Sequence, residues 1–319
     1  MLHGILRSYL FDKIGRGVNL EILRSLLFVP GNRPNMLRKS INFSPDAYVP
    51  DLEDSVPDVE KDNARNLVVS YIPKLANVGP LLIPRVNPRD TGLMELDLAA
   101  VICPSTFAIS VGKVRNADDV IEISKLVGIQ EERAGLKHGH IKLLIWIEIA
   151  VAVVNAYEIC SASQRTIAVA FGAEDFTNDM GVERTDDDSE VSYPRSVVAV
   201  AARAAGIQAL DTPYVKFKDG NGLKDHASNA RKIGYKGKFA IHPSQIDIIN
   251  SAFSPSVEEI REARRVIDSF VDEERLGKGS TSLEGKMIDI PIVKRAKATI
   301  ARANQLTQVD KRKVIVDGQ

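Results

Sequence analysis

Charged residues follow several short apolar runs of this sequence, each at the point where the run ends. Glu148 comes directly after the run Lys142–Ile147, and Asp175 comes shortly after the run Thr166–Phe171. Arg85 lies near the end of a third run. Two carboxylates from neighbouring strands can share one hard cation, and Mg²⁺ prefers such oxygen ligands while it keeps part of its water shell. The pattern therefore predicts a cation site at Glu148 and Asp175 that suits Mg²⁺.

The chemistry of such a site follows from the positions left open on the cation. A 2-oxo acid could bind there through its carboxylate and keto oxygens, and the metal would polarise the carbonyl group. The guanidinium of Arg85 could stabilise an enolate or alkoxide oxygen, and the backbone N–H groups of residues 173–175 could bind the carboxylate. We predict that three nearby acids hold the metal's waters or orient Arg85: Asp51, Glu53 and Asp54.

Eight apolar runs alternate with segments of helical periodicity. Most of the runs are continuous, as expected for parallel strands that are buried on both faces. The eight strands are expected at Ser25–Val29, Ala47–Pro50, Leu81–Val86, Phe107–Val111, Lys142–Ile147, Thr166–Phe171, Ala209–Val215 and Lys238–Ile241. This alternation predicts an α/β fold of the (β/α)8 TIM-barrel type, which places its chemistry at the C-terminal ends of the strands. An open, doubly wound sheet is the alternative, but Pro30-Gly31-Asn32 after the first run is not a GxGxxG turn.

Two barrel helices carry clear end signals. The periodic segment Val120–Leu126 follows Asn116, a capping residue type, and the segment Ser196–Ala205 precedes Gly206, a residue type that ends helices.

The pattern changes after the eighth run, which divides the chain into three parts. Residues 1–23 are expected to form an N-terminal helix or a targeting segment, and residues 24–253 the catalytic barrel. Residues 254–319 are expected to form a helical extension that caps the site, either of its own chain or of a neighbouring subunit. Within it we predict helices at Val257–Asp272 and Met287–Ala303, a loop at 276–282 between them, and Pro291 in the first turn of the second helix.

The composition excludes several classes of protein. The 42 basic and 42 acidic residues among 319 give no net charge, which argues against a nucleic-acid partner. No run of 18 apolar residues occurs, so we expect no membrane span. Cys103 and Cys160 show no CxxC spacing, which argues against a zinc site. The first twenty residues are basic and amphipathic, a pattern shared by mitochondrial presequences and by ordinary terminal helices.

Five short motifs in order give the sequence a family resemblance that extends from about residue 24 to about residue 305. They are Arg24–Gly31, Asp51–Asp54, Arg85–Asn87, Gly172–Phe176 and Ile241–Gln245. Together they resemble the HpcH/HpaI aldolase and citrate lyase β-subunit family. The tail, with Gly277-Lys278-Gly279 and Gly285–Pro291, resembles the citramalyl-CoA lyase branch that is found in mitochondria.

The resemblance implies a Mg²⁺-dependent carbon–carbon lyase with a barrel of the pyruvate kinase/phosphoenolpyruvate type, assembled as a homotrimer. It implies cleavage of (3S)-citramalyl-CoA to acetyl-CoA and pyruvate, in mitochondria or alternatively in the cytoplasm. The alternatives are a malyl-CoA or citryl-CoA lyase, a malate synthase-like enzyme and a thioesterase acting on the same acyl-CoA substrates. A non-catalytic CoA-binding subunit is an alternative from another class.

Position by position, the resemblance assigns roles to single residues. Glu148 and Asp175 match the family's metal ligands, and Arg85 matches its catalytic, substrate-binding arginine. Asp289 matches a catalytic aspartate that a neighbouring subunit contributes in relatives, where it would act as an acid or base. The positions that match binding sites for CoA or substrate are Phe28, Asn35, Lys39, Ala240 and Ile241.

The sequence departs from the family pattern at three places. Glu148-Ile149-Ala150-Val151-Ala152 replaces Glu-Thr-Ala-x-Gly, and Gly112-Lys113-Val114-Arg115 replaces Pro-Lys-Val-Glu. Asn35 stands where a lysine is common. These departures leave Glu148 and Asp175 in place, and they bear on the acyl-group preference more than on the reaction class.

Overall fold

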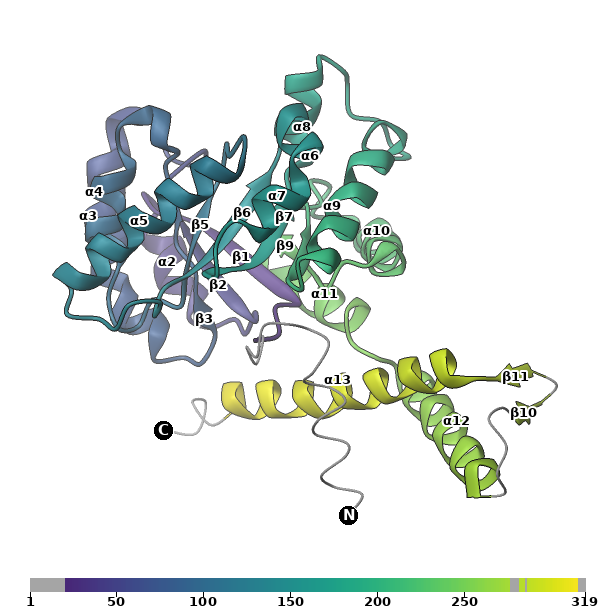
Figure 1. Ribbon diagram of the computed structural model, residues 1–319. Helices are drawn as coiled ribbons and strands as arrows, with labels where there is room; N and C mark the ends of the chain where they lie inside the picture. Colours follow the sequence, from purple (N-terminus) through teal and green to yellow (C-terminus); the bar gives the residue numbers. More distant parts are fainter. Residues whose placement is uncertain (1–20, 276–280, 285, 315–319) are drawn as a thin grey trace.

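The computed structural model describes residues 21–275, 281–284 and 286–314 (Figure 1). Residues 1–20 of the predicted N-terminal segment, and the Gly277-Lys278-Gly279 part of the tail motif, lie outside the described residues.

A closed barrel of parallel strands forms the body of the protein. The strand order is β1-β9-β8-β7-β6-β5-β4-β2-β3, and β1 also pairs with β2 in parallel, which closes the sheet. This closure confirms the predicted TIM barrel and excludes the open sheet. The strands are β1 Ser25–Pro30, β2 Ala47–Asp51, β3 Leu81–Leu82, β4 Arg85–Val86, β5 Ala108–Val111, β6 Lys142–Ile147, β7 Thr166–Phe171, β8 Gln208–Asp211 and β9 Gly237–Ala240.

The third of the eight predicted strands is broken into β3 and β4. Pro84 lies at the break and has no N–H group to donate to a neighbouring strand. Beyond it, β4 pairs with β2 only through Arg85 and Asp51, which lie opposite each other in the register. The break therefore leaves the barrel closed and sets Arg85 beside Asp51.

The seventh predicted strand, Ala209–Val215, was too long at its C-terminal end. β8 ends at Asp211, and residues 212–214, which include Pro213, are not part of any strand. A proline cannot donate a ladder hydrogen bond, so a strand through this position is disfavoured.

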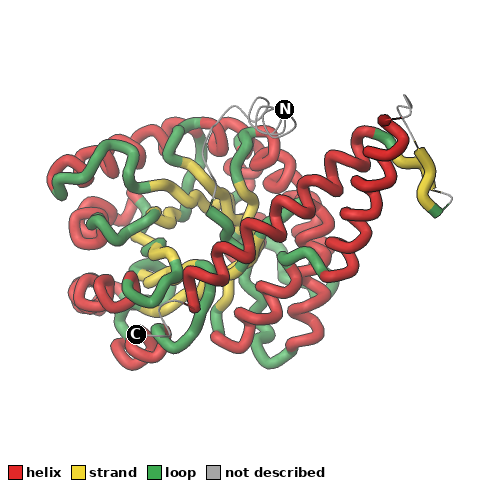
Figure 2. Tube along the Cα trace, turned by 90° about the horizontal axis from the view of Figure 1, so that it is seen from below, coloured by secondary structure: helices red, strands yellow, loops and turns green. Residues whose placement is uncertain are grey.

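Helices cover the outside of the barrel (Figures 1 and 2). One large apolar cluster fills the space between helices and strands, and a second fills the barrel interior around Leu26, Trp146 and Phe239. The helices are α2 Pro34–Ser40, α3 Lys61–Ala76, α4 Met94–Val101, α5 Ala117–Arg133, α6 Ala150–Val154, α7 Ala156–Ser161, α8 Ala173–Met180, α9 Ser192–Ala204, α10 Gly220–Ile233 and α11 Ile246–Ala252. Short 3₁₀ helices lie at Asp58–Glu60, Arg89–Thr91, Ser189–Val191 and Pro243–Gln245.

The predicted helix ends correspond to real ones. The side chain of Asn116 accepts a hydrogen bond from the Asp119 N–H group at the start of α5. Gly206 follows α9 with a positive φ of 72°, which glycine adopts without strain.

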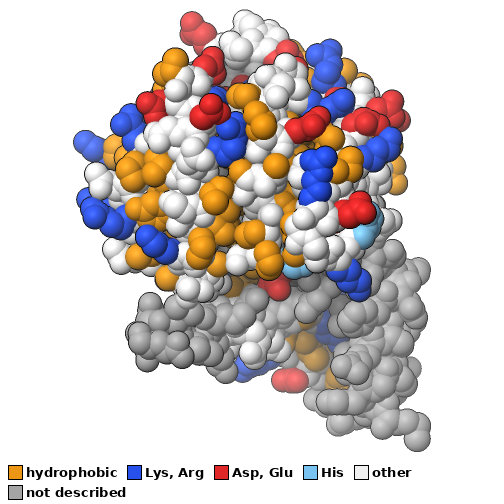
Figure 3. Space-filling model, turned by 90° about the vertical axis from the view of Figure 1, so that its left-hand side faces the viewer, with side chains coloured by type: hydrophobic (Ala, Val, Ile, Leu, Met, Phe, Trp, Pro, Cys, Tyr) orange, Lys and Arg blue, Asp and Glu red, His pale blue; other side chains and the backbone are white. Residues whose placement is uncertain are grey.

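The outer surface of the barrel carries charges of both signs. Figure 3 shows one outer face of the barrel, on which basic and acidic side chains are interspersed with apolar ones. Among the described residues, none of the helices combines the length and the apolar character that a membrane span requires.

The C-terminal extension forms an arm of two packed helices that projects from the barrel (Figure 1). The helices are α12 Val257–Arg275 and α13 Ile290–Val314, and a strand pair, β10 Thr281–Leu283 and β11 Lys286–Ile288, lies between them. Met287 thus belongs to a strand rather than to the predicted helix, and part of the predicted loop 276–282 is β10. Pro291 does lie in the first turn of α13.

The C-terminal part of α13 packs across the N-terminal ends of the barrel strands (Figure 2). Leu306 and Val309 form an apolar cluster with Ile22, which precedes β1. The ammonium group of Lys313 donates to Asp46, a residue that directly precedes β2. The extension therefore lies against the end of its own barrel that is opposite to the C-terminal strand ends.

Buried charges fix this contact. Asp46 accepts hydrogen bonds from the backbone N–H, Nε and Nη2 of Arg24 at 2.7, 2.9 and 2.9 Å, and its side chain is fully buried. Arg24 also binds Asp310 of α13 at 2.6 Å, but the Asp310 side chain is 56% exposed.

Replacing Asp46 by alanine should lower the free energy of unfolding by about 3–5 kcal/mol, because it leaves two buried cations without their partner. Urea denaturation followed by circular dichroism measures the change. Asp310→Ala is the matched control, since it removes an exposed partner of the same arginine and should change the stability by less than about 1 kcal/mol. Equal effects of the two substitutions would contradict the assignment of Asp46 as the anchor.

Candidate active site

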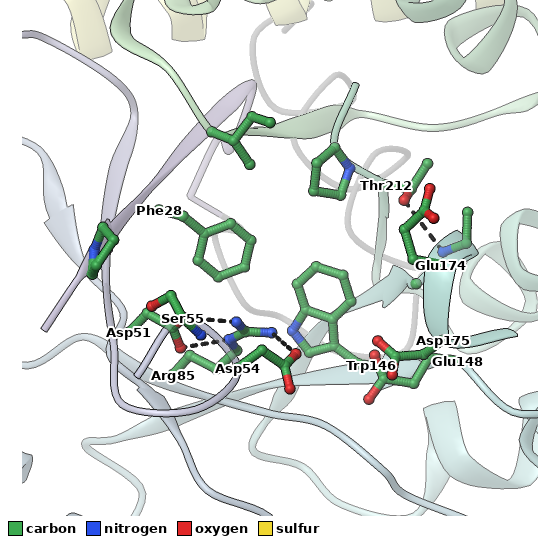
Figure 4. Close-up of a pocket in the computed structure, with 15 residues that line it drawn as sticks. Phe28, Asp51, Asp54, Ser55, Arg85, Trp146, Glu148, Glu174, Asp175 and Thr212 are labelled. Carbon is green, nitrogen blue, oxygen red and sulfur yellow. Dashed lines mark hydrogen bonds and ion pairs between the residues drawn. The ribbon is translucent and has the colours of Figure 1, made fainter. Parts of the chain in front are cut away.

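A pocket of about 430 Å³ opens at the C-terminal ends of the barrel strands (Figure 4). Seven strands, β1, β2, β4, β6, β7, β8 and β9, contribute a lining residue at their C-terminal ends or in the turns that follow. The lining contains five carboxylates and one guanidinium. The predicted strand-end residues Arg85, Glu148 and Asp175 all line this one pocket.

Arg85 is held in one orientation by three acids. Its Nε and Nη2 atoms bind the two carboxylate oxygens of Asp51, each at 2.7 Å. Its Nη1 atom lies 3.1 Å from Asp54 Oδ2 and 3.0 Å from Glu53 Oε2. The guanidinium carbon lies 4.6 Å from the ring centroid of Phe28. The guanidinium of Arg85 is therefore fixed in place before any substrate binds. A group that stabilises a developing negative charge has to be oriented in advance in this way.

The turn after β2, which carries Glu53 and Asp54, is held by hydrogen bonds to its backbone carbonyl groups. Lys61 Nζ donates to the carbonyl oxygens of Leu52 and Glu53, both at 2.9 Å. Asn87 Nδ2 also donates to the Leu52 carbonyl at 2.9 Å. The backbone of the turn, and with it the direction of the Glu53 side chain, is therefore constrained.

Glu148 lies deep in the pocket at the end of β6 and is 3% exposed. Its Oε1 atom accepts the backbone N–H of Lys113 at 2.7 Å. A Cβ atom at Gly112 would lie 2.5 Å from Oε1, and one at Gly172 would lie 2.6 Å from Oε2, so a side chain at either position would force the Glu148 carboxylate to move. Burial raises the pKa of Glu148 to about 7 despite the opposing effect of the Lys113 ammonium.

Asp175 lies in the first turn of α8, and its side chain is 37% exposed. It forms an ion pair with the ammonium group of Lys113, and the same Nζ atom lies 3.7 Å from Glu148 Oε1. Burial alone would lower the pKa of Lys113, but the carboxylates of Glu148 and Asp175 raise it. A cationic side chain thus lies between the two predicted metal ligands.

The donor set fits a hard cation such as Mg²⁺. Glu53 Oε1 is buried and has no hydrogen-bond partner, and it lies close to the same point beside Gly112 as Glu148 Oε1 does. Within the described residues, no three or more His, Cys, Asp and Glu side chains are already gathered as a metal cluster. Glu148 and Asp175 by themselves would leave most positions of a cation to water, which suits Mg²⁺.

The helix that carries Asp175 also offers backbone donors. Gly172 precedes α8, and the Ala173 N–H group already donates to Thr212 Oγ1 at 3.2 Å. The N–H groups of Glu174 and Asp175 belong to the first turn, where helix geometry leaves donors without intrahelical partners. Two of the three predicted N–H groups can therefore face an anion.

The remaining predicted binding residues are spread around the pocket. Phe28 and Ile241 line it, whereas Ala240, at the end of β9, is fully buried in the apolar layer between the strands and the helices. Asn35 and Lys39 lie exposed on α2, outside the lining, and Asn35 Oδ1 accepts a hydrogen bond from Arg38. The structure therefore brings Phe28 and Ile241 to the pocket, and leaves the roles of Asn35 and Lys39 as predictions.

Asp289 is not part of this pocket. It lies in the arm directly before α13, where its Oδ1 atom accepts the N–H of Ile292 at 3.1 Å. Among the residues that the structure describes, none that lines this pocket follows Ile241 in the sequence.

Sequence reasoning missed the importance of Lys113, Trp146 and Thr212. Trp146 is buried in the core inside the barrel, with its ring centroid 4.4 Å from that of Phe239, and it also lines the pocket. In the sequence, Lys113 is notable only as part of the segment Gly112–Arg115 that departs from the family pattern. Its positive φ of 56°, which directs it to Glu148, carries no signal in the sequence.

Comparison with known proteins places this barrel and its pocket in a family. Residues 24–243 match the model of the HpcH/HpaI aldolase/citrate lyase family. Citrate lyase subunit beta of Haemophilus influenzae is 37% identical over 284 residues, which cover 89% of this chain and 98% of the relative. The mitochondrial citramalyl-CoA lyase of Homo sapiens is 30% identical over 298 residues, which cover 89% and 86%.

A solved structure gives the same result. CitE from Mycobacterium tuberculosis, in complex with magnesium, acetoacetate and coenzyme A, aligns with a TM-score of 0.70 at 29% identity and covers 89% of this chain and 98% of that chain. The chain therefore belongs to the HpcH/HpaI aldolase/citrate lyase family, whose relatives here are lyases. The predicted family is confirmed.

Glu53 gives the site a pH-dependent stability that can be measured. Burial raises its pKa from 4.5 to about 8 against the effect of Arg85, with help from the charges of Asp54 and Glu148. Between about pH 4.5 and about pH 8 the unfolded chain loses this proton while the folded protein keeps it, so ionisation opposes folding.

We therefore expect wild-type protein to lose stability relative to the Glu53→Gln variant as the pH rises from about 4.5 to about 8, and the difference to stay constant above that. Urea unfolding of both proteins over this range is the measurement. A difference that does not change with pH would show that Glu53 is ionised throughout, as a normal carboxylate would be.

Proposed function

We propose that the protein is a Mg²⁺-dependent carbon–carbon lyase that cleaves a 3-hydroxyacyl-CoA into acetyl-CoA and a 2-oxo acid. The observation that carries this proposal is the joint position of a fixed guanidinium, Arg85, and two carboxylates, Glu148 and Asp175, at one mouth of the barrel. The binding of magnesium and coenzyme A by the similar CitE structure supports it.

Each part of the pocket has a task in such a cleavage. Mg²⁺ held by Glu148 and Asp175 would supply Lewis-acid polarisation of the substrate oxygens. Arg85 provides fixed positive charge for an oxygen that becomes negative as the carbon–carbon bond breaks. The rings of Phe28 and Trp146 form an apolar wall that excludes water from the reacting carbon atoms. A proton must also leave the 3-hydroxyl group and another must reach the acetyl-CoA carbanion, which requires an acid/base group.

The charge of the pocket favours citramalyl-CoA as the substrate. Arg85 is the one cation among the lining residues, and three acids already occupy its donors. Citryl-CoA has a carboxymethyl group at the position where citramalyl-CoA has a methyl group. It therefore carries one more carboxylate. The methyl group suits the apolar wall, whereas an additional anion would face the five lining carboxylates.

Citryl-CoA is the second candidate, because the citrate lyase subunit beta of Haemophilus influenzae is more similar in sequence than the human citramalyl-CoA lyase is. Malyl-CoA lyase, malate synthase-like and thioesterase activities use the same substrate groups. Mitochondrial location stays a prediction that rests on the tail motif, with the cytoplasm as the alternative.

Incubation of the protein with Mg²⁺ and citramalyl-CoA, malyl-CoA or citryl-CoA tests the proposal directly. We expect acetyl-CoA and pyruvate from citramalyl-CoA at the highest kcat/KM, and a loss of about a hundredfold or more in the Asp175→Asn variant, because one metal ligand is weakened. Chromatography of the CoA products gives the result.

Three outcomes separate the alternatives. Free CoA in place of acetyl-CoA would identify a thioesterase, and preferred cleavage of citryl-CoA would support the second candidate. Cleavage of none of the three substrates, with binding of CoA retained, would favour a non-catalytic CoA-binding subunit.

We further infer that the acid/base group is Asp289 of a second copy of the chain, within a homotrimer. Asp289 lies in the arm directly before α13 and does not line the pocket of its own chain. Met287 and Ile290 on either side are 67% and 54% exposed, which leaves apolar surface available for another subunit.

This inference predicts complementation between two inactive variants. Asp289→Asn and Arg85→Met proteins should each lack activity, whereas their co-expression should restore about a quarter of the wild-type rate, because mixed oligomers contain some intact sites in a closed ring. The rate of citramalyl-CoA cleavage measures it. Activity no higher than the sum of the two separate variants would place Asp289 in its own site or outside catalysis.

A further inference from the structure

Lys113 occupies an unusual place in the structure. It follows Gly112 after the strand β5, and its φ is 56°. Only three of the described non-glycine residues have a positive φ. A left-handed conformation costs a residue with a side chain about 1–2 kcal/mol, so it persists where other contacts enforce it. Here the enforcing contact is the 2.7 Å hydrogen bond from the Lys113 N–H group to Glu148 Oε1.

The same conformation brings the side chain to both proposed metal ligands. The ammonium group forms an ion pair with Asp175 Oδ1 and lies 3.7 Å from Glu148 Oε1. The Lys113 side chain is 29% exposed, so its head group can move toward solvent while its backbone stays on Glu148. Lysine has a flexible stem of four methylene groups that permits such a movement.

Mg²⁺ and this ammonium group need the same oxygens. The metal binds carboxylate oxygens at about 2.0–2.1 Å and tolerates little deviation from octahedral geometry. Two cations on one pair of carboxylates also repel each other. Binding of the metal therefore requires the ammonium to leave Asp175 Oδ1, and the energy of that ion pair is subtracted from the affinity for the metal.

We propose that Lys113 is an internal competitor of Mg²⁺ for Glu148 and Asp175, and that it couples metal binding to binding of the 2-oxo acid. After displacement the ammonium remains beside the metal without its former partner. The carboxylate of a 2-oxo acid on the metal provides a new partner. Binding of the acid therefore gives the Lys113 ammonium group an ion pair in place of the one that the metal displaced. Lys113 thus disfavours metal alone and favours the metal together with the acid. The inference rests on the proposed function, because it requires Mg²⁺ at this pair.

The affinity for Mn²⁺, measured from the free-ion electron paramagnetic resonance signal, tests the competition without any assay of activity. Lys113→Met keeps the length of the stem and the backbone strain but removes the charge. We expect it to bind Mn²⁺ about tenfold more tightly than the wild type in the absence of an acid, within the usual range of coupling between sites. A purely structural lysine gives the opposite sign, since its loss leaves two carboxylates less well ordered. Equal or weaker binding by Lys113→Met overturns the proposal.

Pyruvate tests the coupling. In the wild type, saturating pyruvate should strengthen Mn²⁺ binding by a larger factor than it does in Lys113→Met, and by linkage the metal should strengthen pyruvate binding to the same extent. Quenching of Trp146, the one tryptophan of the chain and part of the pocket wall, reports pyruvate binding independently. Equal factors in the two proteins overturn the coupling.

Three controls keep the result interpretable. Lys216→Met removes another lysine that is paired with an acid, but this pair with Asp186 is exposed and outside the pocket, so Mn²⁺ binding should not change. Lys113→Arg retains the charge and should remain close to wild type. Unfolding curves verify that each variant is folded.

Asp175→Asn separates this inference from the proposed function. If the wild type binds no Mn²⁺, or if Asp175→Asn binds it equally well, the proposed metal site itself is wrong and the inference fails with it. If Asp175→Asn loses binding while Lys113→Met gains none, only the role of Lys113 is wrong.

Discussion

The ion pair between Arg85 and Asp51 is the contact on which the architecture of the pocket depends. The two residues lie opposite each other in neighbouring strands and form two hydrogen bonds of 2.7 Å. Arg85 then gathers Glu53 and Asp54 from the turn that follows β2. Because a buried guanidinium without this partner would be costly, the pair ties closure of the barrel to the arrangement of the acids.

An excess of negative charge is the consequence of this arrangement. Arg85 is shared by three carboxylates, and its charge opposes the raised pKa of Glu148 less than the charge of Lys113 does. Those two acids therefore depend on other cations, and Lys113 and the proposed Mg²⁺ satisfy the same requirement. Burial raises the pKa values of Glu53 and Glu148, because the nearby positive charges are too few to offset it.

Most of the barrel and the centre of the site could be predicted from the sequence. Continuous apolar runs gave the strands because both faces of a parallel barrel strand are buried, and β2 and β7 are buried at every position. Arg85, Glu148 and Asp175 were found because strand ends of one barrel meet at one mouth. The errors arose where a single proline overrides a run, as Pro84 and Pro213 do.

Other features depend on geometry that no run of residues encodes. The Gly112 departure from the family pattern looked neutral for the metal pair, yet Glu148 Oε1 lies where a side chain at 112 would begin. The role of Lys113 depends on one backbone angle, and that of Asp289 on the path of the arm. Without the family resemblance, Asp289 would have been only the residue that precedes a helix.

The attachment of α13 to the N-terminal mouth has a consequence for how such a protein can diverge. Asp46, with Arg24 and Lys313, fixes the arm at one end of the barrel, and the departures Ile149 and Ala152 lie beside Glu148 at the other. Mutations that reshape the reacting end are thereby insulated from those that would loosen the arm. The acyl-group preference can therefore change during evolution while the attachment of the arm to the barrel stays the same.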